Sequence, residues 1–332
     1  MTWDRSLPNA APGLLCAALI AAVATFLARF APILGAPVCA ILLGVLARAT
    51  IPLPTLLDRG IALSARMVLQ GAIVVSGFGV SLAAIWQTGL GTLPITMGTI
   101  AVALGLAPFA GRLLGVDVKV RELVGVGTAI CGASAIAAVS CVIEPSEAEV
   151  SLAIATIFFY NIVAVLTFPL LGHVLGLSQA QFGTWAGTAI NDTSSVVAAA
   201  FAYGQEAGTH ATIVKLTRAT LILPIVAVVG LLAVRASRKA SSRIPWAKIT
   251  PWFVLWFLVA ALANTAGAVP PSSHGAIAEV STFLISVALA AIGLQTDMRQ
   301  LLSAGARPLA LGLVLWVSVA LSSLVLQHLT HL

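Results

Sequence analysis

The chain has 332 residues, of which 60% are hydrophobic and only 8% are charged. Soluble domains carry about a quarter charged residues, so this composition excludes an ordinary water-soluble fold, and the 6% aromatic content without ten-residue alternation disfavours a membrane β-barrel. The formal net charge of +6 does not indicate nucleic-acid binding, because the basic residues lie at the ends of apolar segments rather than on one soluble face.

The apolar segments predict an all-α polytopic membrane protein with about 11 transmembrane helices, since one crossing takes about 20 apolar residues. We expect a single integral membrane transporter domain over residues 1–332. The predicted spans are 13–30, 36–48, 61–82, 90–110, 121–143, 148–171, 183–203, 209–234, 250–267, 277–296 and 307–328.

Lys and Arg gather in alternate connectors, of which 112–122 and 235–248 are the most polar. Positive charge marks cytoplasmic loops, so an odd number of spans places the N-terminus in the cytoplasm and the C-terminus outside. With the first span (13–30) set aside, ten spans divide into repeats at 36–171 and 183–328. Five crossings in each half give the halves opposite orientations, as in inverted-repeat transporters.

In that arrangement the fourth helix of each half is expected to be interrupted and to cross its counterpart. These helices are 121–143, which contains "GTAICGASAIAA", and 277–296, which runs into "LAAIGLQTD" (289–297). Small residues in the first motif could simply let helices pack closely. Alternatively the helix opens, and the backbone at Cys131, Gly132, Ala133 and Ser134 offers free N–H groups to an anion. A similar stretch, "GTAINDTSSVVAA" at 187–199, could reflect small-residue composition alone.

Polar side chains inside predicted spans are the other candidates, because charge in a bilayer is costly and is usually functional. Asp192 lies among Asn191, Thr193, Ser194 and Ser195, and it either has a functional role or caps a helix that starts at Thr193.

Lys215 and Arg218, three residues apart, share one helix face. They either extend to the membrane interface or attract an oxyanion inside, where a contact between Asp192 and Lys215 is a further hypothesis. The cysteines at 16, 39, 131 and 141 and the histidines have no metal-ligand spacing, so we expect neither a metal site nor a cofactor.

Four motifs, "AICGASAIAAVSCVI", "GTAINDTSSVVAAA", "IVKLTRATLILP" and "LAAIGLQTDMRQLLSAGARPL", resemble the bacterial YeiH family, described as sulfate exporters. The resemblance runs from about residue 12 to the C-terminus. It implies membership of the cation/proton antiporter and anion transporter superfamily, two inverted repeats of five helices, and a location in the bacterial inner membrane. The chain departs from the family pattern at Asn191, Ser195 and Cys141, where histidine, glutamine and proline are expected.

These observations favour a secondary active transporter of a small anion, sulfate or a related oxyanion, coupled to protons or sodium, in contact with the lipid bilayer. The alternatives are a cation/proton antiporter that uses Asp192, a passive channel, and an intramembrane enzyme. The enzyme is disfavoured because Cys131 and Ser134 have no histidine nearby in the sequence to activate them. The oligomeric state stays open, with a homodimer among the candidates.

Overall fold

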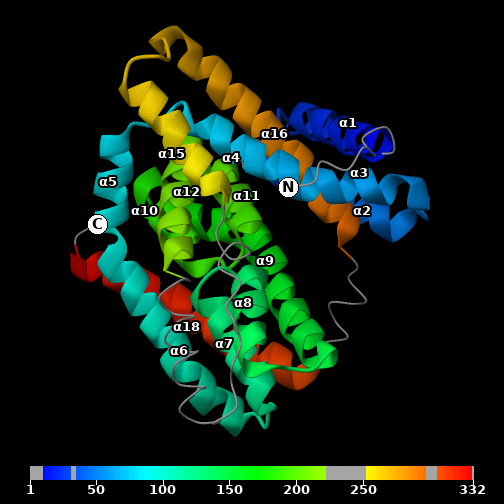
Figure 1. Ribbon diagram of the computed structural model, residues 1–332, viewed down its shortest axis with the longest axis vertical. Coiled ribbons are helices and arrows are strands. Elements are labelled where there is room, and N and C mark those ends of the chain that lie inside the picture. Colours follow the sequence, from blue (N-terminus) through cyan, green and yellow to red (C-terminus); the bar gives the residue numbers. More distant parts are fainter. Residues whose placement is uncertain (1–9, 31–34, 222–251, 297–304, 331–332) are drawn as a thin grey trace.

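The structure is a computed structural model that describes residues 10–30, 35–221, 252–296 and 305–330. All regular secondary structure in these ranges is helical, so the predicted all-α class is confirmed (Figure 1). The basic connector at 235–248 lies outside the described residues. The helices form two groups, one toward the top and right of Figure 1 and one toward its lower left.

The first group contains the N-terminal helices and two later ones that return to them. α2 packs most extensively against α16, and the two helices approach closely at Gly44 and Gly293. A Cβ added at Gly293 would lie only 2.4 Å from Ile41 O, so only glycine permits this approach. The elements are α1 (Ala11–Leu27), α2 (Gly35–Thr50), η2 (Thr55–Leu57), α3 (Asp58–Leu63), η3 (Ser64–Val68), α4 (Leu69–Gly77), α15 (Trp252–Thr265), η4 (Pro271–Ser273) and α16 (His274–Gln295).

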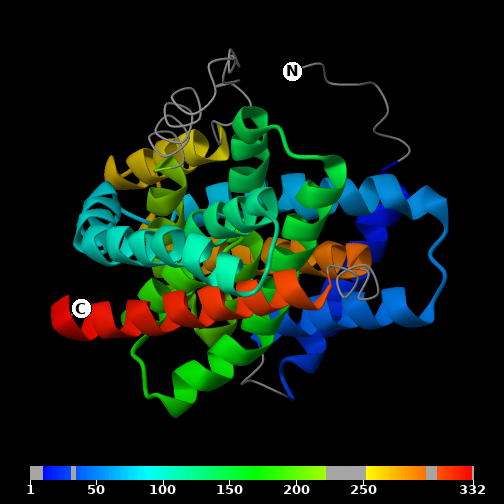
Figure 2. The same ribbon diagram turned by 90° about the horizontal axis from the view of Figure 1, so that it is seen from below.

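The second group contains the central part of the chain and its last helix. α6 and α18 run side by side, as Figure 2 shows, and α12 packs against both α10 and α11. α11 also contacts α2 and α16 and thereby joins the groups. The elements are α5 (Leu82–Gly91), α6 (Leu93–Leu113), α7 (Val118–Ala129), α8 (Ala133–Ile143), α9 (Glu147–Val174), α10 (Gln179–Ala189), α11 (Thr193–Tyr203), α12 (Gln205–Thr220) and α18 (Ala306–Thr330).

Side-chain caps set the starts of two central helices. Ser146 and Glu149 form a capping box at α9, and Ser178 and Gln181 form one at α10. In each box the serine hydroxyl accepts from the backbone N–H three residues on, while the Glu or Gln side chain accepts from the serine N–H. These reciprocal bonds satisfy N–H groups that helix geometry leaves free, so both helices begin at defined residues.

Five helical segments in the described ranges are long and apolar enough to cross a membrane. They are Thr55–Gly77, Leu93–Leu113, Glu147–Val174, Pro271–Gln295 and Ala306–Thr330. Ala11–Leu27, Gly35–Thr50, Thr193–Tyr203 and Trp252–Thr265 are apolar but shorter. Helices occupy all the predicted spans in their described parts, but the number of eleven crossings and the inverted repeats stay predictions.

One predicted interruption is present and the other is wrong. The helix over 121–143 breaks between α7 and α8, as expected. The segment 277–296 does not break, because α16 runs continuously from His274 to Gln295 and its Gly293 serves close packing against α2. The second interruption lies instead in the segment 183–203, between α10 and α11.

Candidate functional site

Two interrupted helices meet in the second group. The first break, Ile130–Gly132, separates α7 from α8, and the second break, Ile190–Asp192, separates α10 from α11. A Cβ added at Gly132 would lie 3.7 Å from both the backbone N and the Cβ of Asp192, so the breaks are in contact. The structure therefore brings together the two similar motifs at 127–138 and 187–199, whose resemblance reflects a shared local structure.

Gly132 shapes the first break. Its φ of +67° and ψ of −126° suit glycine but strain other residues. The first helical bond of α8 runs from Ile136 N to Gly132 O, so the N–H groups of residues 133–135 precede it. α8 has no side-chain cap and no acidic residue in its first turn, and Ala133 is half-buried while Ser134 is exposed. The N–H groups of residues 133 and 134 at the positive end of this half-helix are thus open, whereas the N–H of Ala135 faces the Cys131 sulfur.

The second break is closed by side chains. Asp192 is the N-cap of α11, and its carboxylate accepts from Ser194 N at 2.9 Å and from the Ser194 hydroxyl. Asn161 of α9 reaches the same break, where its Oδ1 accepts from the N–H groups of Asn191 and Asp192, both at 3.2 Å. The cap interpretation of Asp192 is confirmed, and Ser194 and Ser195 are buried in the first turn of the helix.

Lys215 connects the two breaks from α12. Its side chain is completely buried, and its Nζ donates to Ile130 O at 3.0 Å and to Ile190 O at 2.9 Å. The interpretation that this lysine extends to the membrane interface is therefore wrong. The predicted contact with Asp192 is also wrong, since the two form no ion pair within 4.0 Å. α12 can supply this bridge because it packs against both halves of the second interrupted helix.

Arg218, one turn further along α12, is also completely buried. Its Nε donates to Ala129 O at 2.8 Å, its Nη2 to Thr128 O at 2.9 Å, and its Nη1 to Thr188 O. These carbonyls end α7 and α10, where helix geometry leaves acceptors free and the dipole is negative. The two cations thus stabilise both interrupted helices. A lysine has three donors and an arginine has five, so one N–H of Lys215 and two of Arg218 remain.

Three buried polar atoms beside the breaks have no hydrogen-bond partner among the described residues. They are Thr128 Oγ1, Asn161 Nδ2 and Asn191 Oδ1. Asn161 was not among the site residues expected from the sequence. Its Oδ1 forms an inter-helix contact with the second break, whereas its Nδ2 has no partner among the described residues.

Cys131 is buried at the first break, and its charged neighbours are Lys215, Asp192 and Arg218. The part of the chain that the structure describes holds no group of three or more His, Cys, Asp or Glu that could bind a metal.

All ten residues expected at the site lie in the two breaks, in the first turns that follow them, or on the facing side of α12. They are Cys131, Gly132, Ala133, Ser134, Asn191, Asp192, Ser194, Ser195, Lys215 and Arg218.

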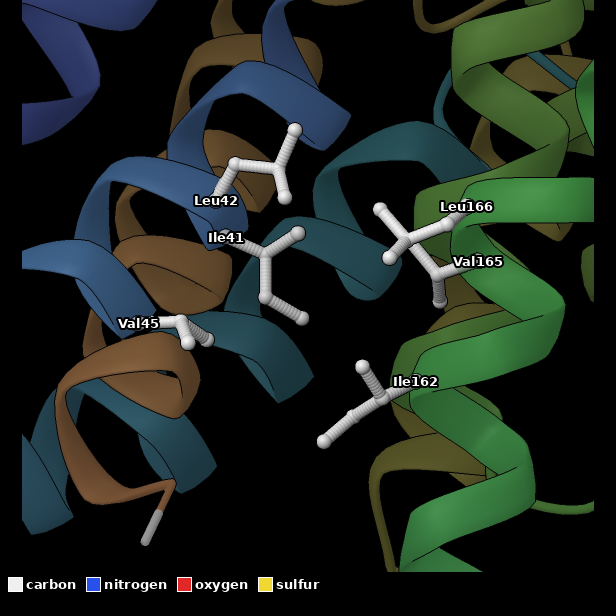
Figure 3. A pocket seen from close by; sticks show the side chains of 6 residues that line it. All are labelled: Ile41, Leu42, Val45, Ile162, Val165 and Leu166. Atoms are coloured by element: carbon white, nitrogen blue, oxygen red, sulfur yellow. The ribbon is translucent and has the colours of Figure 1, made fainter. Parts of the chain in front are cut away.

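A separate cavity of about 150 Å³ lies between α2 and α9. Figure 3 shows its aliphatic side chains facing one another across the gap between these helices. It is lined by Ile41, Leu42, Val45, Ile162, Val165 and Leu166. Because none of these side chains can hydrogen-bond, the cavity does not suit an ion, and the polar site is at the breaks.

Comparison with known proteins gives the family. Residues 12–312 match the family model described as "Conserved hypothetical protein 698". A UPF0324 membrane protein of Streptococcus pyogenes serotype M18 is 42% identical over 331 residues, which cover 95% of this chain and 96% of the relative. A namesake from Streptococcus agalactiae serotype V is 39% identical over 325 residues, with 95% and 96% covered.

No solved structure matches the chain. The names of these relatives state no substrate, so the resemblance to the YeiH sulfate exporters and their superfamily stays a prediction. The match over nearly the whole chain, together with several helices long and apolar enough to span a bilayer, identifies a multi-pass helical membrane protein that belongs to the conserved hypothetical protein 698 family, the UPF0324 membrane proteins.

Proposed function

We propose that the chain is a secondary active transporter that binds a small anion where its two interrupted helices meet. The observation that carries this proposal is the uncapped N-terminal end of α8, which lies beside two completely buried cations. An anion that leaves water for a membrane interior loses its hydration, so it needs fixed positive charge and oriented dipoles in exchange. A helix N-terminus supplies such dipoles from the backbone.

The distribution of charge at the breaks favours an anion over a cation. The negative ends of α7 and α10 are matched by Lys215 and Arg218, and the positive end of α11 is matched by Asp192. The positive end of α8 has no side-chain cap and no acidic residue in its own first turn, and the carboxylate of the neighbouring Asp192 is already bonded as the cap of α11. With both Lys215 and Arg218 protonated, two cationic side chains and one carboxylate also leave one net positive charge. A cation exchanger based on Asp192 would have to bind its ion against this charge.

Asp192 is the group best placed to couple transport to protons. Its side chain is half-buried rather than sealed, and it touches the first break at Gly132. Protonation of this carboxylate would remove the only negative side chain identified at the breaks and would change how strongly the site holds an anion. Coupling to sodium is the competing arrangement, and the pH dependence of transport separates the two.

Counterflow in proteoliposomes tests the proposal. Purified protein is reconstituted with unlabelled sulfate, phosphate, bicarbonate or acetate inside, and uptake of the same labelled anion is followed. We expect an internal anion to accelerate uptake, and Gly132→Leu to abolish this effect. Ala137→Leu, at an exposed position on the same half-helix, is the matched control and should exchange normally. Flux without acceleration would indicate a channel, and no flux for any of these anions would contradict the proposal.

A further inference from the structure

Two asparagines at the second break have buried side-chain atoms without a hydrogen-bond partner. Asn161 and Asn191 are both 1% exposed, and neither Asn161 Nδ2 nor Asn191 Oδ1 has a hydrogen-bond partner in the described structure. The orientation of the Asn161 amide is fixed, because its Oδ1 already accepts from two backbone N–H groups. Its Nδ2, on the same amide, therefore presents a donor at the break.

Unpaired buried groups of this kind are rare, because each costs about 1–3 kcal/mol. Here one is a donor and the other is an acceptor, and both belong to residues that lie at one break. A ligand that satisfied both would need an acceptor atom and a donor hydrogen of its own. An oxyanion without a proton has only acceptors and would leave Asn191 Oδ1 unpaired.

Charge adds an independent condition. With Lys215 and Arg218 protonated and Asp192 ionised, the side chains bonded at the two breaks sum to one net positive charge. A monovalent anion neutralises this charge, whereas a divalent anion leaves one negative charge in excess in a buried site. Because isolated charge is costly in a low-dielectric interior, the site favours the monovalent species.

We propose that the substrate is a monovalent oxyanion that carries its own O–H group, the class that includes bicarbonate and dihydrogen phosphate. Asn161 Nδ2 donates to one of its oxygens, and Asn191 Oδ1 accepts its hydroxyl hydrogen. The free N–H groups at the start of α8 bind the remaining oxygens. This inference rests on the proposed anion transport and makes fully deprotonated sulfate the poorer ligand.

Anion binding to the purified protein, measured by calorimetry in detergent at constant ionic strength, tests this class with two matched pairs. Bicarbonate and acetate are planar monoanions of similar size, in which a hydroxyl replaces a methyl group. The methylphosphonate monoanion and methanesulfonate are the tetrahedral pair, and only the former has a hydroxyl. In at least one pair we expect the hydroxyl-bearing anion to bind about tenfold more tightly or better, and to bind more tightly than sulfate.

Variants assign the preference to the two asparagines. Asn191→Leu removes the acceptor, so the hydroxyl-bearing anion of each pair should fall to the affinity of the anion without a hydroxyl, whose own affinity should stay within about threefold. Asn161→Asp keeps an oxygen for the N–H groups of Asn191 and Asp192 but replaces the donor by a carboxylate oxygen, so all four anions should bind at least tenfold more weakly. Thermal unfolding of each variant shows whether it is folded.

The outcomes separate the two proposals. If no anion binds to the wild-type protein, the proposed function fails. If anions bind but neither pair shows a preference, or sulfate binds most tightly, the inference about a hydroxyl-bearing monoanion is overturned while anion transport stands. A preference that persists in Asn191→Leu overturns the assignment of the acceptor. The wild-type comparison decides the matter even if a variant does not fold.

Discussion

Both breaks leave carbonyl and N–H groups at the helix ends without helical partners, and the two breaks satisfy these groups differently. At both, the carbonyl ends of the preceding half-helix are held by Lys215 and Arg218. Beyond this, the second break is closed by the Asp192 cap and by Asn161, whereas the first break has only Gly132 before α8. The breaks thus share their anchored ends but differ in whether the following helix N-terminus is occupied.

This difference teaches where a ligand fits. A helix start that carries its own carboxylate needs no anion, but one without a cap or an acidic residue keeps free donors and a positive dipole end. We interpret the helix start at the first break as the main binding element, while the second break is closed by its own cap and offers a ligand only its two asparagine groups.

Arg218→Ala should have the largest effect, because it removes what the breaks share. Three carbonyl oxygens, on Thr128, Ala129 and Thr188, would lose their donor in the buried interior. At about 1–3 kcal/mol for each unpaired group, we expect the melting temperature in detergent to fall by about 5 °C or more. Arg218→Lys keeps the charge but not the planar set of donors, so its melting temperature should lie between those of Arg218→Ala and the wild-type protein. Arg112→Ala, at an exposed position, is the control and should leave melting unchanged.

Gly132 variants should affect the first break alone. Any side chain at φ +67° is strained by about 1–3 kcal/mol, and a Cβ there would also lie 3.3 Å from Ile157 Cγ2. Gly132→Ala should therefore fold but start α8 poorly and reduce anion binding at least tenfold. Gly132→Leu should abolish binding. Circular dichroism and calorimetry check helix content and affinity, and unchanged affinity in both variants would mean that the glycine serves packing only.

The sequence predicted the first break and the residues around it because a glycine between small residues in an apolar helix is a local signal. It missed the second break for a related reason. Topological symmetry predicts the second interrupted helix at 277–296, although "GTAINDTSSVVAA" carries the same local signal as "GTAICGASAIAA". In α16 the glycine serves a contact with α2, and only three-dimensional packing reveals that use.

The cations show the other limit of sequence reasoning. Their spacing on one face of α12 was readable, but their partners are backbone carbonyls of two distant segments. No side-chain pattern encodes such partners. For the same reason the role of Asn161, whose partners are backbone N–H groups, could not be derived from its isolated position in an apolar span.

Asp192 variants separate capping from coupling at the second break. Asp192→Asn retains a good N-cap and should change stability little, whereas Asp192→Ala should lose about 1 kcal/mol. If the carboxylate carries a coupling proton, transport by Asp192→Asn should lose its pH dependence while the melting temperature stays near that of the wild-type protein. Counterflow measured across a pH series checks this. Retention of the full pH dependence would leave Asp192 as a cap only.

Ser134→Ala should have the smallest effect, and it tests how much of the first break is backbone. Ser134 lies in the first turn of α8, and its exposed side chain adds one hydroxyl donor to the free N–H groups there. Removing the hydroxyl leaves the backbone donors in place and puts no polar group into a dry interior. The loss should thus be that of one hydrogen bond, about 0.5–1.5 kcal/mol, or up to about tenfold in affinity.

The melting temperature should not change in this variant. The matched control is Ser140→Ala on the same half-helix, whose hydroxyl donates back to Ile136 O within α8 and is not part of the break. If both variants bind anions like the wild-type protein, the site consists of backbone donors, the asparagines and the cations. If Ser134→Ala alone abolishes binding, the serine is the principal ligand and the open helix end is secondary.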